Sequence, residues 1–180
     1  MKATFLKFNL LFLSVFLLLN SCGTNSDVDD LIGDNTNFYL TAKVGGNNFS
    51  ADLSDPATWG AFKYHTGTLT ISVPDDVANV GNGTMMINIL SGYTGTGTYT
   101  VGVGATGNNY ARYTTGSMST GNMNSWNAET SHNSTGTGTV TVTSDANNIV
   151  EGTFSFTGVS SDTTSKQITE GKFRLKISQQ

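Results

Sequence analysis

The sequence is poor in cysteine, in charged residues and in long apolar runs. Because Cys22 is its only cysteine, no intramolecular disulfide can form, and packing alone must stabilise the folded part. Charged residues make up 12% of the chain, about half the usual share. All 13 acidic residues follow Cys22, against seven of the nine basic residues. Phosphate binding needs a basic face, so we expect no nucleic-acid partner.

The main apolar run is too short to cross a membrane. It covers Leu10–Leu19, whereas a transmembrane helix needs about 20 residues. Lys2 and Lys7 precede it, a pattern that indicates the central region of a secretory signal peptide. The residues that end the run, Leu19-Asn20-Ser21-Cys22, resemble the lipobox of bacterial lipoproteins. In that motif, a peptidase cuts before a cysteine that carries diacylglycerol.

The lipobox implies a signal peptide at residues 1–21 and a lipidated Cys22 that attaches the chain to a membrane. An ordinary cleaved signal peptide is the alternative. Stable anchoring needs two or more acyl chains, which the diacylglyceryl group and an amide-linked chain such as palmitate supply. Residues 22–37 are acidic and nearly free of apolar side chains, as in a disordered tether. The segment 26–30 resembles the signal for export of Bacteroidota lipoproteins to the outer face of the outer membrane, which implies a location at the cell surface. A location on the periplasmic face of the outer membrane is the alternative.

From Phe38 onward the apolar residues recur with a period of two, which is typical of β-strands. Turn-forming residues such as Gly45-Gly46-Asn47-Asn48 separate these stretches, and none shows a helical stripe. We therefore predict a single all-β domain at residues 38–180, an antiparallel β-sandwich or flattened barrel of about eight to ten short strands. The alternating residues include Phe38, Leu40, Ala42 and Val44; Leu69, Ile71 and Val73; Met85, Ile87 and Ile89; Tyr99, Val101 and Val103; Val140 and Val142; Val150, Phe154 and Phe156; and Phe173, Leu175 and Ile177.

The C-terminal part carries a resemblance to a known family. The segments Val150-Glu-Gly-Thr-Phe-Ser-Phe-Thr-Gly158 and Ile168-Thr-Glu-Gly-Lys-Phe-Arg-Leu175 are similar to the closing hairpin of a family of Bacteroidota lipoproteins known only as a domain of unknown function. The strand at 97–102 and the hairpin at 38–49 are similar to it as well. The resemblance implies an envelope lipoprotein and supplies no catalytic residues.

Motif searches give no sign of catalysis, a metal or a cofactor. Neither H-E-x-x-H nor G-x-S-x-G occurs. Residues 102–107 match the G-x-G-x-x-G spacing, but no helix pattern follows them, and the next acid is Glu129. His132 lies three residues after Glu129, and in a strand-and-loop context that spacing fixes no common face for a metal. We therefore predict no catalytic residues, no cofactor and no metal, and a protein that is not an enzyme.

One stretch differs from the rest of the domain. Residues 104–139 contain no Leu, Ile, Val or Phe, but they do contain Tyr110, Tyr113 and Trp126 among Asn, Ser and Thr. Aromatic rings surrounded by neutral hydrogen-bonding groups suit a sugar-binding site, so these three residues are the candidate ligand-binding residues. The alternative is that the rings pack inward from ordinary strands, as most Tyr and Trp side chains do.

These observations favour a noncatalytic binding or accessory module, anchored by the lipid on Cys22 and binding a glycan. Two alternatives stay open. The domain could be a structural or assembly protein that binds another envelope protein through an exposed sheet edge or threonine-rich face. It could also be a hydrolase whose site has no recognisable motif.

Overall fold

The computed structural model describes residues 38–53, 60–64, 67–75, 83–90, 92–117, 121–130 and 135–179. Contacts divide the chain into two units, Met1–Thr36 and Asn37–Gln180, and all described residues belong to the second. Cys22, the predicted signal peptide and the predicted tether thus lie outside the described residues and stay predictions.

The described residues form eleven strands and no helix, and turns and loops connect the strands. This part of the chain consequently contains no helix long and apolar enough to span a membrane. The strands are β1 (Tyr39–Val44), β2 (Asn47–Ser50), β3 (Gly60–Tyr64), β4 (Thr68–Pro74), β5 (Gly83–Ile89), β6 (Gly97–Gly102), β7 (Tyr110–Ser117), β8 (Asn122–Ala128), β9 (Thr137–Ala146), β10 (Ile149–Val159) and β11 (Ser165–Gln179).

The predicted all-β fold is confirmed, with some differences in detail. Eleven strands exceed the expected eight to ten because β7 and β8 carry no aliphatic alternation: their inward positions hold Ala111, Tyr113, Trp126 and Ala128. Three strands are also longer than expected, since β9, β10 and β11 have 10, 11 and 15 residues. The described pairings are antiparallel except for β3 with β11, which are parallel.

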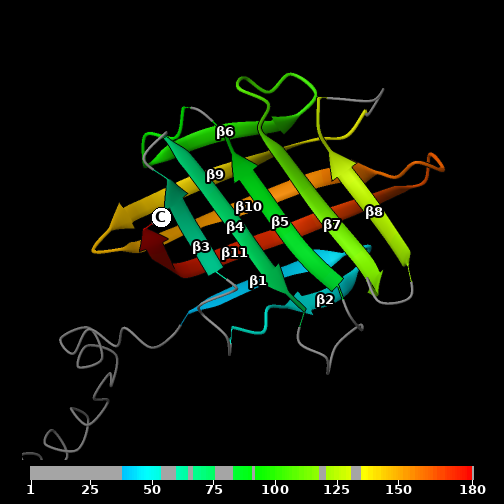
Figure 1. Cartoon of the computed structure of the whole chain (residues 1–180), viewed down its shortest axis with the longest axis horizontal. Helices are drawn as coiled ribbons and strands as arrows, with labels where there is room; N and C mark the ends of the chain where they lie inside the picture. Colours follow the sequence, from blue (N-terminus) through cyan, green and yellow to red (C-terminus); the bar gives the residue numbers. More distant parts are fainter. Residues whose placement is uncertain are drawn as a thin grey trace, which may run out of the picture. The chain divides into compact units, whose positions relative to one another are not determined.

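The strands form two layers that are continuous at two corners (Figure 1). The five-stranded layer contains β3, β4, β5, β7 and β8, and the six-stranded layer contains β6, β9, β10, β11, β1 and β2. At one corner, β11 pairs with β1 as far as Arg174 and with β3 from Ile177 onward. At the other, β10 pairs with β9 as far as Thr157 and with β8 at Val159. Because β10 and β11 also pair with each other, this ring of strands closes into a flattened barrel.

The core lies between the inner faces of the two layers. Strand alternation places most of the apolar residues on this side, where burial of their side chains drives folding. Val103, expected to continue the pattern of β6, instead lies in the turn after Gly102 and is 50% exposed. The largest fully buried side chains are Phe49, Phe173, Leu40, Leu69, Ile71, Met85, Ile87, Ile89, Ile168, Leu175, Val73 and Val101.

The hairpin β10–β11 contains the sequence E-G-x-F twice, and its register explains the repeat. Gly152 pairs with Phe173, and Phe154 pairs with Gly171, so each glycine lies opposite the ring of the other motif. A Cβ atom on Gly152 would lie 2.6 Å from Phe173 Cζ, and one on Gly171 would lie 2.6 Å from Phe154 Cδ1. Glycine is required at both positions because the two rings cover the backbone directly.

Candidate functional site

The structure does not bring the three candidate aromatic residues to one surface. Tyr113 points into the barrel and is 3% exposed. Trp126 pairs with Tyr113 across β7 and β8 and packs, partly buried, against the same core. Tyr110 lies three residues before Tyr113 on β7, and an odd separation on a strand places it on the outer face. Tyr113 and Trp126 therefore form an inner pair, and Tyr110 is a separate ring on the outer face.

The inner pair belongs to an aromatic cluster at one end of the barrel. The Tyr113 and Trp126 rings stack with centroids 6.1 Å apart, and Phe49 meets Tyr113 edge-on at 6.2 Å. The Lys166 ammonium lies 4.0 Å from the Trp126 centroid and 5.7 Å from that of Tyr113. The indole Nε1 of Trp126 donates to Thr164 Oγ1 at 3.2 Å. With an ammonium against its ring, Trp126 is not a free stacking surface for a ligand.

A small cavity lies beside this cluster. It measures about 90 Å³, and its walls include Tyr113, Thr115 and Lys166, with Asp75 from the end of β4. Burial, helped by the nearby Asp75 charge, raises the pKa of the Tyr113 hydroxyl, so the phenol stays neutral. Asp75 Oδ1 accepts from the Ser50 backbone N–H at 3.2 Å. A cavity of this size holds a few water molecules and no sugar ring.

Tyr110 stands on the outer face of the five-stranded layer, where it is partly exposed. Its hydroxyl donates to Met86 Sδ at 3.6 Å, and the Arg112 guanidinium lies 5.7 Å from its ring centroid. In register, Tyr110 pairs with Asn88 and Asn88 with Thr70, whose hydroxyl donates to Asn88 Oδ1 at 2.7 Å. These contacts on one side hold the ring in position on an open sheet face.

The nearest outward neighbours of Tyr110 on β7 and β8 are polar and almost free of net charge. Arg112 Nε donates to Asn127 Oδ1, and the Arg112 guanidinium lies 3.7 Å from the Glu129 carboxylate. Thr114 and Ser125 share a hydrogen bond of 2.9 Å one register step further along. We call the following residues of this outer surface the Tyr110 face: Thr70, Asn88, Tyr110, Arg112, Thr114, Ser125, Asn127 and Glu129. Its groups offer one ring with hydroxyl and amide donors and acceptors around it.

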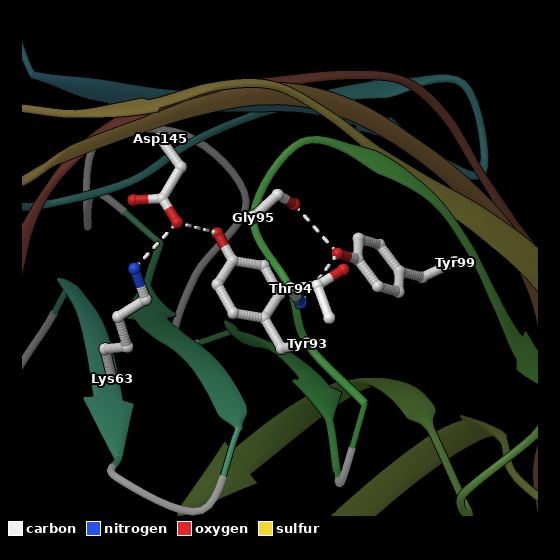
Figure 2. A network of polar contacts seen from close by, with 6 residues as sticks. All are labelled: Lys63, Tyr93, Thr94, Gly95, Tyr99 and Asp145. Carbon is white, nitrogen blue, oxygen red and sulfur yellow. Dashed lines mark hydrogen bonds and ion pairs between the residues drawn. The ribbon is translucent and has the colours of Figure 1, made fainter.

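The opposite end of the barrel contains a polar network that no sequence motif predicts (Figure 2). Asp145 Oδ2 accepts from Lys63 Nζ at 2.7 Å and from the Tyr93 hydroxyl at 2.8 Å. The Lys63 ammonium also lies 5.3 Å from the Tyr93 ring centroid, and that ring packs 5.6 Å from Tyr99. Tyr99 in turn donates its hydroxyl to the Gly95 carbonyl at 2.8 Å. Burial, then the hydrogen bond to Asp145 and its charge, raise the pKa of Tyr93 well above its ordinary value.

The part of the chain that the structure describes contains no metal centre. No group of three or more His, Cys, Asp or Glu side chains there is arranged to hold a metal ion. The glycine-rich segment 102–107 connects β6 to β7, so no helix follows it to receive a pyrophosphate.

The comparisons with known proteins identify a family. The model of the family described as "Domain of unknown function (DUF6252)" matches residues 37–175, and the chain belongs to this family. The match covers both E-G-x-F motifs and all of the Tyr110 face. No curated protein and no solved structure matches the chain.

Proposed function

We propose that this member of the DUF6252 family is a noncatalytic, lipid-anchored protein of the outer membrane that binds neutral glycans through the Tyr110 face. The lipobox ending at Cys22 and the acidic tether support the proposed location at the outer membrane, either at the cell surface or on the periplasmic face. The polar, aromatic Tyr110 face supports the binding function. On the same sequence grounds, we propose that the protein comes from a member of the Bacteroidota. We also propose that one of its lipid groups is a palmitoyl chain.

The position of Tyr110 is the observation that carries the proposal. Sugar rings have apolar C–H faces and a rim of hydroxyl groups, so a matching site combines an exposed aromatic ring with neutral hydrogen-bonding groups. Tyr110 supplies the ring, and Thr70, Thr114, Ser125 and Asn127 supply hydroxyl and amide groups on the same outer face. The contacts of Tyr110 with Met86 and Arg112 restrain the ring in advance, which lowers the entropy cost of binding.

The test measures retention of the purified chain on gels containing starch, xylan, galactomannan or mixed-linkage β-glucan. Replacing Tyr110→Ala should weaken binding to the retained polysaccharide about tenfold, because a stacking ring contributes about 1–1.5 kcal/mol. Tyr110→Phe keeps the ring and should bind nearly normally. Tyr39→Ala removes an exposed ring from the six-stranded layer and serves as the matched control. Binding to none of the four gels, or equal retention of Tyr110→Ala, would reject the proposal.

The anchor is tested separately in cells. Labelled palmitate should be incorporated into the wild-type chain and not into Cys22→Ser, because the thioether and the processing that follows both need the cysteine. The wild-type chain should also enter the detergent phase on Triton X-114 partition. Incorporation that survives Cys22→Ser would show that the lipid is attached elsewhere, and no incorporation into the wild-type chain would show that the segment is an ordinary signal peptide.

A further inference from the structure

The outer face of the six-stranded layer carries an unusual concentration of positive charge. Seven Lys and Arg residues follow position 37, and four of them lie on adjacent strands there: Lys43 on β1, and Lys172, Arg174 and Lys176 on β11. Phe173, Leu175 and Ile177 are buried, so alternation directs the three basic residues of β11 outward. We call these four residues the cationic strip. It stands out because the whole chain has a net charge of −4.

Two of the four charges in the strip are balanced by carboxylates and two are not. Lys43 Nζ lies 2.9 Å from Glu170 Oε1, and Arg174 is paired with Glu151. Among the described residues, no carboxylate lies within 4.0 Å of the ammonium group of Lys172 or Lys176. Both side chains are exposed. The strip therefore presents an excess of two positive charges to solvent.

An open groove and an exposed ring accompany these charges. The groove measures about 620 Å³, and Lys43, Lys172 and Glu170 line it together with Thr41, Asn48 and Ser50. Its charged groups are thus surrounded by hydroxyl and amide groups that can bind a sugar. At the other end of the strip, Tyr39 pairs with Arg174 across β1 and β11 and is 41% exposed.

We propose that the cationic strip binds an acidic polysaccharide, a chain whose sugars carry carboxylate groups. Lys172 and Lys176 are four residues apart on one strand, a separation of about 13–14 Å, so successive acidic groups of an extended chain can reach both. The groove accommodates a sugar unit beside Lys172, and Tyr39 offers a stacking ring further along. An anionic membrane surface fits less well, because a flat bilayer would not use the groove and would meet Glu151 and Glu170.

This site is independent of the Tyr110 face, since the two lie on the outer faces of different layers. The probe is polygalacturonate, with binding to the purified chain measured by calorimetry at low salt. Lys172→Gln and Lys176→Gln should each weaken binding about fivefold, and salt should weaken wild-type binding because it screens exposed charges. Lys166→Gln is the matched control, because it removes a positive charge from the barrel end and should leave binding unchanged.

Three results would overturn the proposal. The first is no binding of polygalacturonate, and the second is an equal loss of affinity with Lys166→Gln. The third is that Lys172 and Lys176 are needed for binding to anionic phospholipid vesicles and not for binding to the polysaccharide. Tyr39→Ala should weaken polygalacturonate binding while leaving neutral-glycan binding intact. Tyr110→Ala should do the opposite. Failure of one site is therefore distinguishable from failure of the other.

Discussion

Both ends of the barrel contain a lysine packed against an aromatic ring, but only one of these lysines has a carboxylate partner. At each end an inward-facing lysine lies against an aromatic ring, Lys63 at 5.3 Å from the Tyr93 centroid and Lys166 at 4.0 Å from that of Trp126. Lys63 also has a carboxylate partner, Asp145, at 2.7 Å. Within the described residues, Lys166 has no carboxylate within 4.0 Å and lies beside a cavity of about 90 Å³.

The difference shows what a carboxylate adds to an ammonium–aromatic contact. The Asp145 side chain is only 10% exposed, so its charge depends on Lys63 and Tyr93 for the interactions that water no longer supplies. The Lys63 end is therefore a closed and interdependent network. Lys166 is partly exposed and has water as an alternative to a carboxylate partner, which makes the Lys166 end more tolerant of change.

The largest expected effect comes from removing the shared acceptor of the closed end. Asp145→Ala leaves the partly buried Lys63 ammonium and the buried Tyr93 hydroxyl without their acceptor. We expect the free energy of unfolding to fall by about 3 kcal/mol, measured by urea denaturation at pH 7.

A double-mutant cycle with Lys63→Met supplies the control for this loss. The double variant should lose less than the sum of the two single variants, since Met removes the unpaired charge that Asp145→Ala creates. A loss below about 1 kcal/mol for Asp145→Ala would contradict the idea that this end is an interdependent network.

A smaller effect is expected from Tyr93→Phe, with a characteristic dependence on pH. The pKa of Tyr93 is raised in the folded state, so above the ordinary value of 10.0 the folded chain holds a proton that the unfolded chain loses. The contribution of Tyr93 ionisation to the free energy of unfolding should be constant below about pH 9 and should fall as the pH rises past about 10. Tyr93→Phe should cost about 1–2 kcal/mol at pH 7 and make the alkaline decline shallower.

Tyr113 provides the comparison at the other end, because its pKa is raised as well, mainly by burial. Tyr113→Phe should remove that residue's own part of the alkaline decline without disturbing Asp145. Urea denaturation at several pH values between 7 and 11 measures both contributions. An unchanged alkaline slope in Tyr93→Phe would mean that Tyr93 ionises as readily in the folded state as in the unfolded one.

The fold was predictable because burial on one face of a strand leaves a period of two in the sequence. Strands such as β4 and β11 have this pattern, and the two E-G-x-F motifs mark the hairpin that joins the layers. β7 and β8 were not predicted as strands because their inward positions hold alanine and aromatic residues, which give no aliphatic alternation. Strand β3 was not predicted because Lys63 points inward and Phe62 outward, the reverse of the usual pattern of apolar residues inside and charged residues outside.

The candidate site was predictable only in part. Tyr113 and Trp126 do lie together, but their rings stack inside the barrel. Strand parity alone would have separated Tyr110 from Tyr113, since three residues is an odd interval. The contact between Lys63 and Asp145 joins residues 82 positions apart, and it depends on a corner of the barrel that no local pattern reveals. The cationic strip needed the same register information, because Lys43 meets β11 only through the pairing of β1.

The smallest expected effect is the most informative about the open end. A cation–π contact contributes about 0.5–2 kcal/mol, and Met in place of Lys166 would keep the aliphatic stem and add a sulfur–aromatic contact. We expect Lys166→Met to change the free energy of unfolding by less than about 1 kcal/mol, against about 3 kcal/mol for Asp145→Ala. Urea denaturation of both variants in one buffer measures the difference. A loss as large as that of Asp145→Ala would mean that the rings alone hold the ammonium as tightly as a carboxylate does, and the two ends would then be energetically alike.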